Sequence, residues 1–271
     1  MSNISLTAGI RSNLIALQKT SELISTTQSR LATGKKVNSA IDGPAAFFTS
    51  QSLTSRADSL TSRLDGIAKG INTVKSADNS LTSIKSIIKQ MKGVASDAKG
   101  TTNAAERSNL ADKFSDLRTQ LDQLQSDATY DGVNLLDSGK LTVEFGEKIG
   151  SATLSLQGFD GSSTGLGIVD AANSWATDDD IDAAVSNLET AEGTVKSESS
   201  NLSSNLSVLT TRKDFTNNIV DILNTGASEL TNADMNEEAA NLLALQTQQS
   251  LGVNALSLAA QSAQSVLKLL A

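Results

Sequence analysis

Cysteine and histidine are both absent from this chain of 271 residues. Their absence excludes thiol and imidazole nucleophiles, zinc sites built from the usual ligands, and a secreted scaffold held by disulfides. Aromatic residues make up only 3% of the chain, which also contains a single proline. A compact enzyme core normally relies on aromatic volume, whereas long helices packed side by side do not. We therefore expect no catalytic residue, no cofactor and no metal ion.

The charge and hydropathy patterns exclude further classes of protein. The formal net charge is −8, which disfavours a duplex nucleic-acid binder. No apolar run is long enough to cross a membrane, so we expect no membrane insertion, and the start of the chain does not resemble a secretory signal peptide. If the protein is exported, we expect a route that spares the N-terminus. Residues 1–40 are basic; this segment could bind an acidic membrane surface, but its lack of aromatics favours a protein partner.

Both ends of the chain carry a thin apolar stripe at helical spacing. One is in residues 4–33 and the other in residues 236–270, and each is too thin to stabilise a lone helix. The two helices could pair within a closed monomer. Gly, Ala and Gln dilute the second stripe, however, which favours extra neighbours supplied by other copies in an open polymer. The predicted assembly residues are Ile10, Leu14, Leu17, Ile24, Leu31, Leu242, Leu245, Leu256, Ala259, Ala263, Val266 and Leu270.

Two breaks separate these terminal helices from the middle of the chain. Gly34 ends the first helix, and the turn signals around Asp42 and Pro44 predict a non-helical connector over 34–48. A second connector is predicted over 226–235, beginning at Gly226. The first connector is expected to bury the apolar side chains of Val37, Ile41, Phe47 and Phe48.

Residues 49–128 and 177–225 are predicted to form a helical rod. From Leu53 to Ala95 the apolar residues alternate steps of three and four, and a turn at 99–103 leads into an antiparallel second helix. Thr177 followed by the acidic cluster Asp178–Asp182 is typical of a helix start. A calcium loop is the alternative, but the spacing of an EF-hand is missing.

Residues 129–176 change in character and predict a small β-hairpin with surface loops. Residues 141–145 and 152–159 have the alternation of strands. Tyr130 and Trp175 could mark a ligand patch, but packing of the hairpin onto the rod is favoured. Ser162, Ser163 and Thr164 lie in a predicted exposed loop and are candidate sites of O-glycosylation. The predicted fold class is mainly α: a long antiparallel helical-bundle rod with a β-hairpin insert, plus paired terminal helices formed by 1–33 and 236–271.

Three separated motifs occur in the order found in one family. Residues 31–40 (LATGKKVNSA), followed by Asp42 and the Ala pair after Pro44, resemble the N-terminal LSTGxxIxSAxDxxA motif of bacterial flagellins. Residues 129–136 resemble the FNGxxLL turn of that family, and residues 233–270 resemble its C-terminal signature. The chain therefore resembles a short flagellin without the outer variable domains. The residues that match the family's connector are Gly34, Asn38, Asp42 and Pro44.

The resemblance implies a structural subunit, not an enzyme, that is secreted through the flagellar type III apparatus and polymerises into the extracellular filament that drives swimming. It implies that the terminal helices form the inner tube and that 34–48 and 226–235 are its spokes. Implied partners are further copies, other flagellins, an export chaperone on the C-terminal segment, and the filament cap and hook-junction proteins. Two alternatives stay open: a hook–filament junction protein of the same superfamily, or an adhesin with flagellin-like ends.

One segment departs from the family pattern. Residues 88–97 align with the segment of many flagellins that Toll-like receptor 5 binds, and the residues concerned are Gln90, Met91, Gly93 and Val94. The family has an arginine at the position of Gln90 and a glutamate at the position of Gly93. Because such charged anchors dominate binding energy, we expect weak or no activation of the receptor.

Overall fold

The computed structural model describes residues 8–148, 150 and 152–270, with the side chains of 8, 263, 264 and 266–270 excepted. The chain divides into two compact units. The first contains the N-terminal residues up to Ser55 and those from Leu223 onward, and the second contains Arg56–Ile222. Long helices dominate both units, and the only sheet among the described residues has two strands. The predicted mainly α fold with a small hairpin is therefore confirmed.

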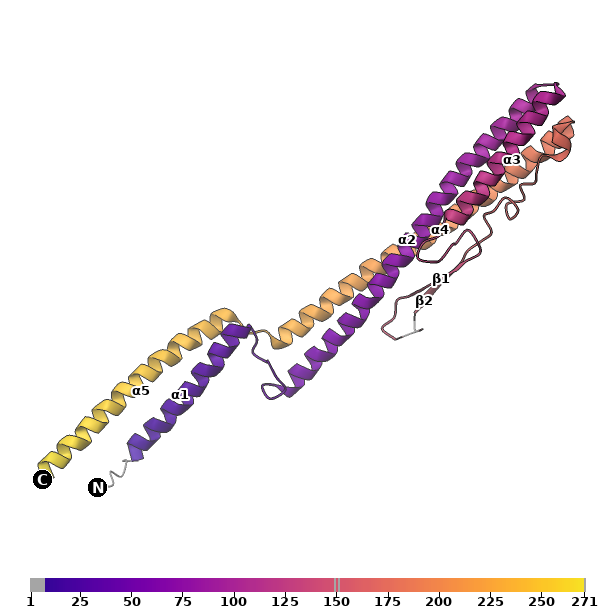
Figure 1. Cartoon of the computed structure of the whole chain (residues 1–271). Helices are drawn as coiled ribbons and strands as arrows, with labels where there is room; N and C mark the ends of the chain where they lie inside the picture. Colours follow the sequence, from indigo (N-terminus) through magenta and orange to yellow (C-terminus); the bar gives the residue numbers. More distant parts are fainter. Residues whose placement is uncertain (1–7, 149, 151, 271) are drawn as a thin grey trace. The chain divides into compact units, whose positions relative to one another are not determined.

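The first unit pairs the two terminal helices. Helix α1 (Ala8–Thr33) lies beside α5 (Met235–Leu270) along most of its length (Figure 1). The same unit contains the first residues of α2 (Pro44–Gly100) and the last residues of α4 (Asp178–Thr231). These two helix ends are in contact, since the Ser50 hydroxyl donates to the Ala227 carbonyl at 3.1 Å.

Both connectors are shorter than predicted. Helix α2 already begins at Pro44, so the first connector ends at Gly43, and the second comprises only Asn232–Asp234. The fixed φ of proline suits the first position of a helix. Gly226 lies inside α4, where a Cβ would stand 3.6 Å from Leu53 Cδ1; packing against that side chain offsets the low helix propensity of glycine. Val37 is buried as predicted, but the prediction of burial is wrong for Ile41 and Phe48, which are exposed.

The second unit has one elongated hydrophobic core. The predicted seam of α2 is buried at most positions from Ala57 to Ala95, and it packs with apolar residues of α3 (Ala104–Asp127) and α4. The turn between α2 and α3 lies where it was predicted, and Asn103 caps α3 by accepting from the Ala105 amide at 3.0 Å.

The hairpin and the following loop close one side of this core. Strands β1 (Lys140–Glu144) and β2 (Thr153–Gln157) are antiparallel, with Leu141 opposite Leu156 and Val143 opposite Leu154. The short helix η1 (Ala172–Trp175) precedes α4, and Trp175 is fully buried edge-to-face against Phe114, with ring centroids 5.0 Å apart. Trp175 therefore anchors the insert to the helices, as predicted.

Serine and threonine hydroxyls along the helices bond to their own backbone. Each donates to the carbonyl oxygen four residues earlier, at 2.8–3.0 Å for Thr20, Thr73, Thr216, Thr247 and Ser250. These hydroxyl groups are thus satisfied within the helix that carries them. No helix among the described residues is long and apolar enough to cross a membrane.

Candidate assembly surfaces

The seam between α1 and α5 is only half-buried. Side chains of α1 at Ile10, Leu17, Ile24 and Leu31 are partly covered, whereas Leu14 is 41% exposed. The α5 residues Leu242, Leu245, Leu256 and Ala259 are also partly covered. The side chains of Ala263, Val266 and Leu270 lie outside the described residues. The structure thus brings most of the predicted assembly residues together, and their role in assembly stays a prediction.

Two buried residues of this seam were missed from the sequence. Thr20 and Thr27 lie between the predicted positions of α1 at steps of three and four, and both are buried. Their spacing alone indicated that they lie in the seam, but polar side chains were not counted as part of the apolar stripe. On α5 the packing leaves no room for a side chain at Gly252, where a Cβ would stand 2.7 Å from Leu17 Cδ2. The absence of a side chain at this position therefore sets the distance between the two helices.

Both helices also expose large apolar side chains to solvent. A two-helix pair with such exposed side chains leaves much apolar surface in water, which favours further association. The exposed residues are Leu14, Ile15 and Leu23 on α1, and Met235, Leu243, Leu251, Val253 and Leu258 on α5.

The two connectors are joined to each other by a short backbone pairing, which we call the clasp (residues 34–37 and 231–233). The amides of Lys36 and Val37 both donate to the Thr231 carbonyl, at 2.8 and 3.2 Å, and the Ala233 amide donates to the Gly34 carbonyl at 2.9 Å. Gly34 has φ +70°, a left-handed conformation that ends α1 without steric penalty. The predicted connector residue Gly34 is therefore central to the clasp.

An ion pair crosses from α1 to α5 beside the clasp. Arg30 Nη1 donates to Glu238 Oε1 at 3.0 Å, and the Glu238 side chain is only 10% exposed. A buried carboxylate of this kind is costly without its partner, so the pair fixes the register of the two helices. Glu238 lies one turn before Leu242 in the same stripe, and it was not among the predicted assembly residues.

The first connector contains a tight turn stabilised by Asp42. Asp42 Oδ2 accepts from the Ser39 amide at 2.9 Å, from the Asn38 amide at 3.1 Å and from the Ser39 hydroxyl at 3.0 Å. These hydrogen bonds, that of the Ser39 hydroxyl first, lower the pKa of the Asp42 carboxyl below its ordinary value. Asn38 Nδ2 in turn donates to the Thr33 hydroxyl at 3.1 Å. The predicted connector residues thus hold a rigid turn on the surface of the first unit.

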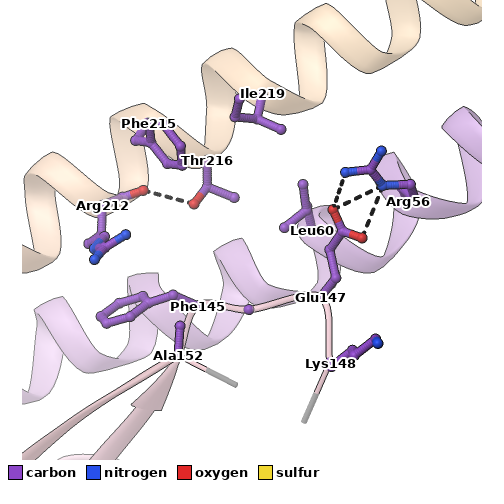
Figure 2. Close-up of a pocket in the computed structure, with 11 residues that line it drawn as sticks. Arg56, Leu60, Phe145, Glu147, Lys148, Ala152, Arg212, Phe215, Thr216 and Ile219 are labelled. Atoms are coloured by element: carbon purple, nitrogen blue, oxygen red, sulfur yellow. Dashed lines mark hydrogen bonds and ion pairs between the residues drawn. The ribbon is translucent and has the colours of Figure 1, made fainter. Parts of the chain in front are cut away.

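The second unit has an open groove of about 490 Å³ between the tip of the hairpin and helices α2 and α4 (Figure 2). Its apolar lining includes Leu60, Phe145, Phe215 and Ile219. On one side Arg56 forms a two-pronged ion pair with Glu147, at 2.8–3.1 Å, and this contact lowers the pKa of the Glu147 carboxyl. This groove could not be predicted from the sequence, because its walls come from three separate parts of the chain.

On the other side of the groove, Arg212 lies over the Phe145 ring, with its guanidinium carbon 5.4 Å from the ring centroid. Such stacking is a favourable contact for a cation, and Arg212 remains exposed to solvent. No salt bridge to Arg212 occurs among the described residues.

The acidic start of α4 serves the helix. The Asp180 amide donates to the Thr177 hydroxyl at 3.3 Å, and that hydroxyl donates back to Asp180 Oδ2 at 2.7 Å, which lowers the pKa of the Asp180 carboxyl. Asp178 pairs with Arg107, and Asp182 pairs with Lys99. Within the described part of the chain, no group of three or more carboxylates is placed to hold a metal ion.

Two other sets of predicted residues are only partly accessible. In the segment aligned with the receptor-binding region, Gln90 and Gly93 are exposed on α2, whereas Met91 is fully buried and Val94 is half-buried. Met91 packs in the core, so it is not part of a surface that a receptor can contact.

Among the candidate glycosylation residues, Ser163 is fully buried. Its amide and hydroxyl both donate to Asp122, at 2.6 and 2.9 Å, so the folded structure disfavours it as an acceptor. The Ser162 hydroxyl accepts from the Gly165 amide at 3.1 Å, and Thr164 is exposed. Thr164 is therefore the most accessible hydroxyl of the three candidates.

Known proteins with similar sequences match most of this chain. Flagellin FljM of Caulobacter vibrioides is 31% identical over 156 residues, which is 58% of this chain and 57% of FljM. Flagellin FljO of the same organism is 28% identical over 260 residues, covering 94% of this chain and 95% of FljO. The chain thus spans little more than half the length of FljM. A crystal structure of Bacillus cereus flagellin has a TM-score of 0.48 and 19% identity, covering 55% of this chain and 86% of that one.

Two family models match the terminal portions. Residues 5–140 match the bacterial flagellin N-terminal helical region, and residues 179–270 match the bacterial flagellin C-terminal helical region. The first match alone covers half of the chain, and the two together leave out residues 1–4, 141–178 and 271. The chain therefore belongs to the bacterial flagellin family.

Proposed function

We propose that copies of this chain polymerise into the filament of a bacterial flagellum, the extracellular propeller for swimming. The observation that carries the proposal is the half-buried seam between α1 and α5, two helices that expose eight large apolar side chains. A pair of helices with so little buried surface needs neighbours, and copies of the same chain can supply them in an open helical array. The proposed role is structural and not enzymatic.

The proposed partners follow from the same surfaces. Other copies, or other flagellins, would cover the exposed faces of α1 and α5 in the filament. Before assembly, an export chaperone would hold the C-terminal segment, which has too little core of its own to stay folded. Contacts with the filament cap and the hook-junction proteins would occur at the two ends of the polymer. Thr164, on the exposed loop, would be the residue to carry an O-linked sugar.

Electron microscopy of the purified protein after salt-induced polymerisation tests the proposal. We expect long, uniform tubes that sediment with nearly all of the protein. Monomers or irregular aggregates under every polymerising condition would contradict it. Abundance in filaments sheared from cells separates a filament subunit from a hook–filament junction protein, which would be present in only a few copies.

The buried ion pair beside the clasp predicts a measurable loss of filament stability. Replacing Glu238 by Gln removes the charge but retains the shape, and leaves Arg30 without its carboxylate. We expect the α1–α5 contact to weaken by about 1–2 kcal/mol, as for a lost hydrogen bond to a charged group. The critical concentration for polymerisation should then rise about tenfold. The matched control is Glu237→Gln, because Glu237 is the exposed neighbour; equal effects of the two substitutions would argue against the pair.

We also expect weak activation of Toll-like receptor 5. Gln90 and Gly93 are exposed where the family has an arginine and a glutamate, so a receptor would find neither charge. The double substitution Gln90→Arg with Gly93→Glu should raise activation about tenfold or more in a reporter assay with purified monomer. Ser86→Arg, one turn earlier on an exposed position of α2, is the control. Full activation by the unsubstituted chain would refute this expectation.

A further inference from the structure

Ile41 is an apolar side chain that the first unit leaves in solvent. It is 93% exposed, more than any other large apolar residue among the described ones. An isolated exposed leucine or isoleucine needs no explanation on a mobile loop. Ile41, however, lies in the turn that Asp42 holds through three hydrogen bonds, and Phe48, 59% exposed, lies at the start of the helix that follows. The turn therefore presents Ile41 as a fixed apolar knob.

The groove of the second unit offers the complementary shape and charge. Phe145 and Phe215 give it apolar walls (Figure 2), and Phe215 is 55% exposed in the isolated chain. Arg212 adds a cation at the rim that no salt bridge among the described residues satisfies. A fitting occupant therefore combines an apolar side chain with an adjacent carboxylate, and the dipeptide Ile41-Asp42 has both.

We propose that Ile41 of one copy inserts into the groove of a second copy, with the Asp42 carboxylate of the first copy facing Arg212 of the second. This inference rests on the proposed function and names two surfaces that would meet in the polymer. Knob and groove lie on different parts of the chain, so each copy can give its knob to one neighbour and receive the knob of another, as a contact in an open polymer requires. Burial of an isoleucine together with a charge pair gives both cohesion and register.

The absence of cysteine from the chain allows a clean cross-linking test. One preparation carries Ile41→Cys and another carries Phe215→Cys, and the two are mixed, polymerised and oxidised. We expect a disulfide-linked dimer on non-reducing gels from the mixture only, not from either preparation alone. The control replaces Phe215→Cys by Val208→Cys, on α4 and two helical turns away. Those positions are about 10 Å apart along the helix, beyond the reach of a disulfide.

A second measurement covers the case in which cysteine at position 41 blocks assembly. Ile41→Ser should raise the critical concentration of polymerisation at least about tenfold, as expected for the loss of a buried isoleucine. Val169→Ser, at another exposed apolar residue, should leave it unchanged. Filaments that form without the cross-link, or an unchanged critical concentration for Ile41→Ser, would overturn the knob-and-groove contact. Failure of the unsubstituted chain to polymerise would instead refute the proposed function.

Discussion

A chain carrying Gly252→Leu is expected to form no filament while its second unit remains folded. Helix α5 approaches α1 at this glycine, where even a Cβ would stand 2.7 Å from Leu17 Cδ2 and 3.1 Å from Leu17 Cγ. The end of the Leu17 side chain can move away from a methyl group, so Gly252→Ala should only weaken assembly. A leucine side chain is too large for that adjustment and forces the helices apart, which costs about 1–3 kcal/mol in each subunit.

The matched control moves the large side chain of the seam from position 17 to position 252. Leu17→Ala combined with Gly252→Leu adds only one methyl group to the total side-chain volume of the seam and should restore sedimentable filaments, at least in part. Gly193→Leu, on an exposed helical position with no atom within reach of the added Cβ, should leave assembly intact. Pelleting and electron microscopy report filaments, and far-UV circular dichroism of the monomer reports the helices of the second unit. Filaments of ordinary length from the single Gly252→Leu variant would contradict the packing described for this seam.

The second large effect is expected at Trp175. Trp175→Ala should lower the free energy of unfolding of the second unit by about 3–5 kcal/mol, the range for removal of a fully buried aromatic side chain. Part of this loss is the edge-to-face contact with Phe114, and the remainder is the cavity left between α3 and the start of α4. Because α4 begins just after Trp175, the loss should also loosen the capping turn at Thr177.

Trp175→Phe separates the volume of the indole ring from its polarity. The Nε1 atom has no hydrogen-bond partner in the described part of the chain, so its removal forfeits no bond. The Trp175→Phe variant should therefore lose less than half as much stability as the Trp175→Ala variant does. Urea unfolding of the monomer, followed by far-UV circular dichroism, measures both. Equal losses for the two variants would contradict this account, because a phenyl ring would then restore none of the packing of the buried indole ring.

The helices of this protein were predictable because their signal is repetitive. From Leu53 to Ala95 the same three- and four-residue steps recur, so an error at one position does not alter the conclusion. The capping turn at Thr177 was predictable for a different reason: its hydrogen bonds join residues only three positions apart. Both features depend on local chemistry that the sequence states directly.

The predictions that were wrong concern residues whose surroundings depend on parts of the chain far away in the sequence. Gly226 looked like a helix end, but Leu53 packs against it and the helix continues. Ser163 looked like an exposed loop residue, but Asp122, far earlier in the chain, binds it and buries it. Ile41 looked like a core residue of the connector, yet no element of the described chain covers it. Thr20 and Thr27 show the converse, because helix pairing buries residues that composition marks as polar.

The serine and threonine hydroxyls that donate to carbonyl oxygens of their own helix affect how easily water is removed from the helix surface. When a neighbour covers a polar surface, each donor that had been bonded to solvent must find a new acceptor or lose free energy. The hydroxyl of Thr247 already donates to the Leu243 carbonyl at 2.9 Å, so its donor loses no hydrogen bond when a neighbour covers it. The methyl group of Thr247 still gains from burial. Helices rich in serine and threonine can thus lose their bound water at little cost in free energy when a neighbour covers them, and they are still well solvated before that contact forms.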